Sequence, residues 1–206
     1  MNTTTTLRRV ALAGATAALA LALTAACGDG MGGMHHDSAK PTVAGTVSGA
    51  AFNDADVMFA QMMIPHHQQA VTMATLAETR AGDPELKKIA AAIKDAQDPE
   101  ITTMTGWLTG WKQPTAAPGG HSMPGMSATM PGMLSAEELA ALTTASGTAF
   151  DRLFARGMIA HHNGAITMAR DEEAKGANPD AKALAASIEK SQAAEVEALQ
   201  KILNRL

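Results

Sequence analysis

The chain has 206 residues and a formal net charge of −4, with 16 Lys and Arg against 20 Asp and Glu. A net acidic chain has no overall attraction for phosphate backbones, which argues against nucleic acid as a partner. The single cysteine allows no intrachain disulfide, so the fold must be held together by core packing.

The N-terminus has the layout of a secretory signal peptide. Arg8 and Arg9 precede an uncharged Ala/Leu run over 10–26, which is shorter than a membrane span of about 20 residues. Small residues before Cys27 resemble a bacterial lipobox, in which the cysteine is lipidated and becomes the first mature residue. An ordinary cleavage site with an incidental cysteine is the alternative. Removal of 1–26 leaves 14 Lys and Arg, 20 Asp and Glu and a net charge of −6.

A flexible tether and a first helical hairpin are predicted next. Residues 27–52 are rich in Gly, Ser, Thr and Ala and lack a sustained apolar period, which is typical of a linker. The folded domain is expected over 53–206. Its first helix is predicted from residue 53 or 54 to 80 and its second from about 85 to 111. Asp98-Pro99 could instead begin a new helix within the second segment.

A loop and a second hairpin complete the predicted domain. Residues 112–134 are rich in Pro, Gly and Met, and they are too many and too polar for an ordinary connection. Ser135 to Glu138 form a capping box that predicts a short helix, ending near Gly147. Two more helices are predicted at about 148–175 and 179–206.

The two hairpins repeat the same sequence at an offset of 95 residues. Residues 56–74 and 151–169 are identical at eleven of nineteen positions, and matches continue through Pro84/Pro179 and Glu100/Glu195. Repeat 1 covers about 53–111 and repeat 2 about 148–206. A unit of this length forms a helical hairpin that cannot bury its apolar face alone. The sequence therefore predicts an all-α fold, a four-helix bundle made of two repeated hairpins.

Each repeat carries a His-His pair among methionines. Helical spacing places His66 on one face with Met62, Met63 and Met73. In repeat 2, His161 shares its face with Met158 and Met168, while Gly157 replaces Met62, so the two copies need not bind equally. His67 and His162 lie about a quarter-turn away, where they could face a neighbouring helix or solvent.

The partner helix of each repeat carries a polar pair within an apolar stripe. The pairs are Gln97 with Glu100 and Gln192 with Glu195. Buried amides and carboxylates need partners, and a histidine N–H on the facing helix is the expected one. An acceptor at this position would also fix the tautomer of a metal-ligating imidazole, so these four residues are candidates for supporting such ligands.

Imidazole and thioether together favour particular metals. Methionine sulfur is soft and carries no proton, so it suits Cu(I) and Ag(I) and adds little for Mg, Ca or Mn. Finger-like zinc spacing and the Glu-x-x-His motif of di-iron bundles do not occur in the sequence. Loop methionines and histidines are candidates for secondary sites: Met31, Met34, His35, His36, His121, Met123, Met126, Met130 and Met133.

Other interpretations of the same residues stay open. A methionine stripe often fills a core, and a lone histidine on an apolar face is often structural. A non-metal interaction module is therefore one alternative. A metal-dependent redox enzyme is another, although no nucleophile with an adjacent base or acid pair with evident geometry supports catalysis.

The pattern F-x-x-x-M-I-x-H-H-x-x-A-x-x-M-A, followed by a Gln-x-x-Glu helix, resembles the bacterial family called domain of unknown function 305. It occurs at residues 59–74 and again at 154–169. The resemblance implies a ferritin-like helical bundle and an extracytoplasmic copper-binding or copper-resistance role, since the family includes a periplasmic copper-binding protein.

The sequence thus leads to the hypothesis of a copper-binding lipoprotein on the outer face of the cell membrane, anchored through Cys27. Its bundle site would use His66, His67, His161 and His162 with nearby methionines, and the loop methionines would collect copper more weakly. A copper-transfer protein is the expected partner. Because imidazole must be neutral to bind metal, we expect binding at the bundle to weaken as the pH falls through the ordinary histidine range near 6.5.

Overall fold

The computed structural model describes residues 51–115 and 130–206, which form helices and short connections. The helices are α1 (Asp54–Arg80), α2 (Pro84–Gly110), α3 (Ala136–Thr144), α4 (Gly147–Lys175) and α5 (Pro179–Arg205). The predicted all-α class is confirmed. The predicted signal peptide, Cys27 and most of the tether lie outside the described residues. None of the described helices is long and apolar enough to cross a membrane.

Local capping chemistry explains where α1, α2, α3 and α5 begin. Asn53 caps α1 through a capping box with Asp56, and Ser135 forms the predicted capping box of α3 with Glu138. Asp83 caps α2 in the same way as Asn178 caps α5, and each is followed by proline at the first helical position.

The alternative helix start at Asp98-Pro99 is wrong, because α2 runs unbroken through Pro99. Ile93 and Gln97 before the proline and Met104 and Leu108 after it are all buried on one face. Continuous burial along this face outweighs the backbone hydrogen bond that proline removes.

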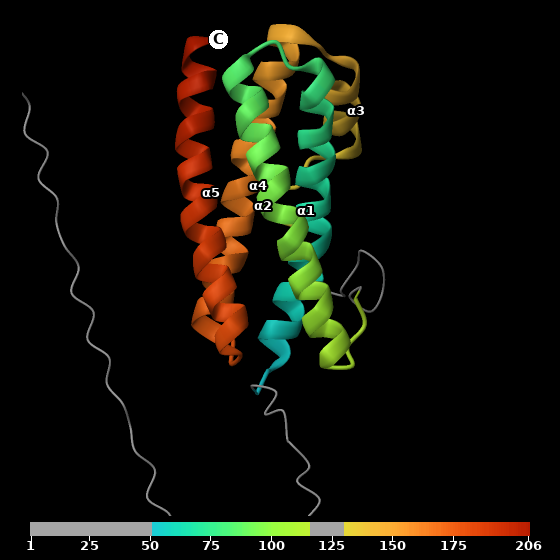
Figure 1. The fold of residues 1–206 in the computed structure, drawn as a ribbon, viewed down its shortest axis with the longest axis vertical. Helices are drawn as coiled ribbons and strands as arrows, with labels where there is room; N and C mark the ends of the chain where they lie inside the picture. The colour runs from blue at the N-terminus through green and yellow to red at the C-terminus, as the bar shows by residue number, and fades with distance from the viewer. Residues whose placement is uncertain (1–50, 116–129) are drawn as a thin grey trace, which may run out of the picture. The chain divides into compact units, whose positions relative to one another are not determined.

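The four long helices lie side by side as two hairpins, α1 with α2 and α4 with α5 (Figure 1). The hairpins meet mainly through α1 and α4, and α2 and α5 make fewer contacts. The short helix α3 packs beside α1 and α4. This arrangement places the two His-His helices against each other.

Two aspartates fix the antiparallel alignment of α1 and α4. Asp151, at the start of α4, accepts hydrogen bonds from the backbone N–H groups of Gly82 and Asp83 at 3.0–3.2 Å. Its repeat counterpart Asp56, at the start of α1, accepts from Ala177 and Asn178 at 2.8–3.2 Å. Each hairpin therefore inserts a buried carboxylate into the turn of the other, and the two sets of contacts follow the sequence repeat.

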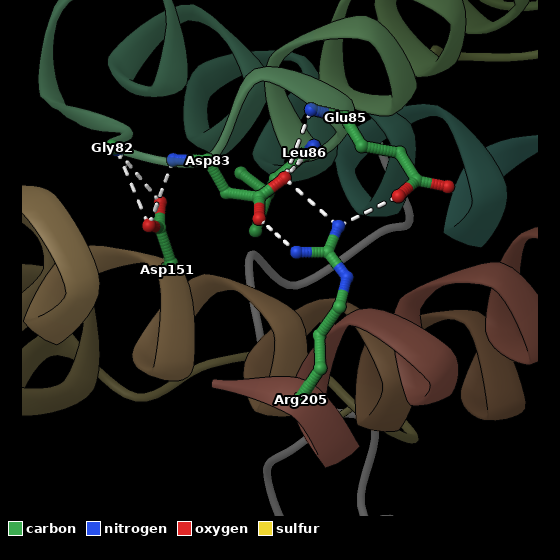
Figure 2. Close-up of polar contacts among 6 residues, drawn as sticks. All are labelled: Gly82, Asp83, Glu85, Leu86, Asp151 and Arg205. Atoms are coloured by element: carbon green, nitrogen blue, oxygen red, sulfur yellow. Dashed lines mark hydrogen bonds and ion pairs between the residues drawn. The ribbon is translucent and has the colours of Figure 1, made fainter.

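An arginine reinforces one of these ends. Figure 2 shows Arg205, near the end of α5, contacting the carboxylates of Asp83 and Glu85, beside the turn that Asp151 holds. The Arg205 guanidinium is the main cause that holds the pKa of Asp83 down to about 2, with help from the backbone N–H groups of Leu86 and Glu85. Asp83 therefore stays ionised as both helix cap and ion-pair partner.

The opposite end carries a buried acid that repeat 1 lacks. Glu172 is 2 % exposed, and its repeat counterpart is Ala77. Burial, together with the neighbouring Asp56 carboxylate, raises the pKa of Glu172 to about 8. Burial alone would raise the pKa of Asp56 too, but hydrogen bonds from Asn53, Asn178 and Ala177 outweigh it and leave that pKa lowered. The proton of this pair is thus held by Glu172.

The core divides into two apolar clusters. One contains Met73 and Met158 with Phe150 and Phe154, and the other contains Met63 and Met168 with Phe59. Along each long helix, buried polar side chains lie between the residues that belong to the two clusters. This polar layer consists of His66, His67, Gln97, His161, His162 and Gln192.

Replacing Asp151 with alanine should destabilise the domain by about 3 kcal/mol, because two backbone donors lose a charged acceptor. Urea unfolding at pH 7 measures the change in the free energy of unfolding. Asp95→Ala, at an exposed position of α2, is the control and should stay within about 0.5 kcal/mol of the parent. Equal effects of the two substitutions would show that the Asp151 contacts do not hold the hairpins together.

Replacing Glu172 with glutamine should make the domain less sensitive to alkaline pH. A carboxyl with a folded pKa of about 8 and an ordinary value of 4.5 contributes stability below 4.5 that is lost as the pH rises to about 8. The Glu172→Gln variant should therefore gain stability over the parent at pH 9 and little at pH 4.5, as measured by urea midpoints. The control Glu78→Gln, at an exposed ion pair with Lys94, should show no such trend.

Candidate metal centre

The structure brings all four predicted histidines into the polar layer. His66 and His67 come from α1 and His161 and His162 from α4, and each is fully buried. The rings of His66 and His161 lie against each other, with centroids 3.7 Å apart and planes tilted by 39°. The repeat therefore forms one layer in which the two His-His pairs meet.

The outer pair, His67 and His162, faces the carboxylates of the partner helices. His67 Nε2 lies 2.8 Å from Glu100 Oε2, and His162 Nε2 lies 2.7 Å from Glu195 Oε2. The second contact is close but poorly aligned for a hydrogen bond. The interpretation that these histidines could face solvent is wrong, because α2 and α5 cover them and supply the two glutamates.

A third acceptor comes from the segment before α3, which the sequence did not indicate. His66 Nε2 lies 3.0 Å from the backbone carbonyl oxygen of Pro131. A carbonyl or carboxylate oxygen can only accept, so Nε2 of His66 and of His67 must carry the proton. The lone pair of each neutral ring is then on Nδ1.

Several polar atoms of the layer have no hydrogen-bond partner among residues 51–115 and 130–206. They include the buried Nδ1 atoms of all four histidines and Nε2 of His161. Within the same residues, neither side-chain amide atom of Gln97 is paired, with an imidazole or otherwise, and Gln192 Oε1 also has no partner. Buried polar atoms without partners are costly and mark places where a ligand can bind.

Burial keeps the central imidazoles neutral. Burial lowers the pKa of His66 to about 4. The nearby His67 and His162 lower this pKa further, and the hydrogen bond to the Pro131 carbonyl opposes the shift only in part. For His161, burial and the neighbouring His66, His162 and His67 lower the pKa to about 2. The sequence-based expectation of titration near pH 6.5 is therefore wrong for these two rings, because it ignored desolvation by the neighbouring helices.

The predicted methionine ligands lie in the two apolar clusters that border the layer. Met63 and Met168 belong to one cluster and Met73 and Met158 to the other, so α1 and α4 each contribute a thioether to both. Met62 is half-buried, and in the other repeat a Cβ atom at Gly157 would lie 3.2 Å from the Leu134 side chain. Within residues 51–115 and 130–206, no three His, Cys, Asp or Glu side chains are grouped to hold a metal ion.

The predicted loop ligands divide between described and undescribed residues. Met130 and Met133 lie in a turn closed by the Met133 N–H and the Met130 carbonyl at 3.1 Å. The other candidates lie outside the described residues: Met31, Met34, His35, His36, His121, Met123 and Met126.

In an NMR titration of the metal-free protein, the His66 and His161 rings should remain neutral at pH 5 and titrate near pH 4 and pH 2. In urea both should titrate near 6.5, because unfolding restores their hydration. The folded state consequently cannot take up these protons, and its stability should fall as the pH drops below 6.5. Midpoints near 6.5 in the folded protein would contradict the desolvated layer.

Several solved structures share this fold. A Streptomyces coelicolor protein named as a secreted DUF305 protein is 31% identical, with a TM-score of 0.68 over 73% of this chain and 93% of that chain. A DUF305 fragment from Deinococcus radiodurans is 31% identical, with a TM-score of 0.66 over 75% and 98%. CopM in its Cu(II)-bound form is 38% identical, with a TM-score of 0.61 over 73% and 96%.

Family membership follows from the sequence match as well as from these structures. CopM is also known in Cu(I)-bound, Ag-bound and apo forms. No curated protein matches this chain. The domain of unknown function DUF305 matches residues 56–203, which include both His-His pairs and all four long helices except the start of α1 and the end of α5. The chain belongs to the DUF305 family.

Proposed function

We propose that this protein is an extracytoplasmic lipoprotein that binds Cu(I) or Ag(I) and serves in copper sequestration, tolerance or delivery. Its four long helices would form a ferritin-like four-helix bundle. The signal peptide and lipidated Cys27 would anchor the bundle to the outer face of the cell membrane, and the segment 27–52 would act as its tether.

The main support is a set of four buried imidazoles whose Nδ1 atoms have no partner among the described residues, two of which, His66 and His161, are kept neutral by burial. Metal binding requires a deprotonated ring nitrogen, and burial supplies it without competition from protons near neutral pH. Acceptors at Nε2 of His66 and His67 orient those rings, as is common for metal-ligating histidines.

The chemistry of the surrounding residues favours a soft monovalent ion. With no group of three His, Asp or Glu side chains in the described residues, the remaining donors next to the layer are thioethers. We propose that the metal ligands are His66, His67, His161 and His162 with methionines from Met63, Met73, Met158 and Met168, in one shared site or in one site per repeat. Met62 would be a further donor in repeat 1. Glu100 and Glu195 would orient imidazoles, and Gln97 and Gln192 would border the site.

The similar proteins support the same conclusion. CopM is known with Cu(I), Cu(II) and Ag bound, and the Streptomyces coelicolor relative is named as secreted. On this proposal, the loop methionines collect ions more weakly, because a loop must lose conformational entropy when it binds. A copper-transfer protein would receive or supply the ion.

Replacing His66 and His161 together with alanine should abolish tight Cu(I) and Ag(I) binding and leave Zn(II) binding weak in both proteins. Competition with a chromogenic chelator measures the affinities, and circular dichroism checks that the helices persist. Met58→Leu is the control, because Met58 is an exposed methionine on the same helix.

Two outcomes would overturn the proposal. A folded double variant that binds as tightly as the parent would make the histidines structural and favour a non-metal interaction module. Retention of Zn(II) as strong as that of Cu(I) would remove the preference for soft ions.

A further inference from the structure

Residues 130–134, here called the strap, lie directly over the central histidine pair. The strap is a tight turn with Pro131 at its second position and Gly132, at φ +79°, at its third, which is the pattern of a type II turn. Pro131 is exposed, whereas His66 and His161 beneath it are fully buried. A single layer of backbone therefore separates these rings from the outside.

Gln69 clamps the end of the strap. Its amide nitrogen donates to the Leu134 carbonyl at 3.0 Å, and its amide oxygen accepts from the Leu134 N–H at 2.8 Å. Gln69 lies three residues after His66 on α1, so the two side chains share a face of the helix. The same helix thus holds the strap at Leu134 and contacts it at Pro131.

Two glycines let the strap backbone touch α4. A Cβ atom at Gly164 would lie 1.8 Å from the Pro131 carbonyl oxygen, and one at Gly132 would lie 2.2 Å from the Ala160 carbonyl oxygen. Contacts this close exclude any other residue without movement of the strap. The position of the Pro131 carbonyl is therefore determined from both sides, by α1 and by α4.

The strap accounts for two of the positions at which the repeats differ. Gly164 stands where repeat 1 has Gln69, and Gly157, where a Cβ would lie 3.2 Å from Leu134, stands where repeat 1 has Met62. Repeat 1 thus supplies the side chain that binds the strap, and repeat 2 supplies the glycines that leave room for it. The two glycines are seven residues apart, which places them on the same face of α4.

We propose that the strap is a positioning element for His66, with Gln69 and Gly164 as the positioning residues. The Pro131 carbonyl accepts a hydrogen bond from the Nε2–H group of His66, as the Glu100 carboxylate does from that of His67. This holds the His66 ring in place and keeps the lone pair on the buried Nδ1 atom, where it is available to a soft metal ion. The inference rests on the proposed function.

The first test uses Gln69→Ala in the full chain, with Gln68→Ala as the matched control. Gln68 is the exposed neighbour of Gln69 on the same helix. In the metal-free protein, ring ¹⁵N shifts should show His66 as the Nε2–H tautomer in the parent and control and as a mixture of tautomers in Gln69→Ala. Hydrogen exchange at the Leu134 amide should quicken only in Gln69→Ala.

The second readout is the affinity for Ag(I), measured by competition. Loss of an acceptor that orients a ligating imidazole lowers affinity by about 10–100-fold, and we expect a loss of that order in Gln69→Ala and none in Gln68→Ala. Gly164→Ala should act in the same direction by pushing the Pro131 carbonyl away. Its control is Gly106→Ala, because a Cβ at Gly106 meets nothing within 4 Å.

The outcomes separate this inference from the proposed function. If the parent binds no Ag(I), the proposed function fails, while the tautomer measurement still tests the strap. An unchanged His66 tautomer in a folded Gln69→Ala variant with rapid Leu134 exchange would overturn the positioning role. Tighter Ag(I) binding in that variant would overturn it as well, because the strap would then obstruct the site.

Discussion

The removal of four imidazoles from water is the constraint on which the rest of the structure depends. An imidazole in an apolar interior must stay neutral, and its polar atoms need partners that only neighbouring elements can supply. Glu100 on α2, Glu195 on α5 and the Pro131 carbonyl each lie against one ring. Both partner helices and the segment before α3 therefore contribute an acceptor to the layer. The Nδ1 atoms left over are what makes the layer chemically useful.

The alignment that creates this layer is set far from it. Asp56 and Asp151 each bind the turn of the opposite hairpin, and these exchanged contacts set the register of α1 against α4. A helical register is discrete because side chains interdigitate, so a shift of one turn would separate His66 from His161. The buried carboxylates at the two ends therefore determine which residues meet in the middle.

The two repeats share the residues that align the hairpins and form the histidine layer. They differ at residues that contact the strap or lie at the ends of the hairpins. Asp56 and Asp151 are repeated, as are the His-His pairs and Glu100 with Glu195. Gly164 breaks the repeat where the strap crosses, and Glu172 and Arg205 break it at the two ends. A pair of identical hairpins could make a symmetric layer, but it could not cover one side of that layer with an intervening segment.

The sequence by itself determined the helices, the repeat and the donor types, because capping residues, proline and helical spacing act over a few neighbouring positions. It also placed Glu100 and Glu195 opposite histidines, since the repeated stripes had to face each other. Tertiary structure alone decided that the rings of His66 and His161 lie against each other, that no described imidazole pairs with Gln97 and that Pro131, 65 residues from His66, contacts its ring. The sequence also could not predict the lowered pKa values of His66 and His161 or the raised pKa of Glu172. Desolvation is a property of the surroundings that packed helices create, and no local pattern records it.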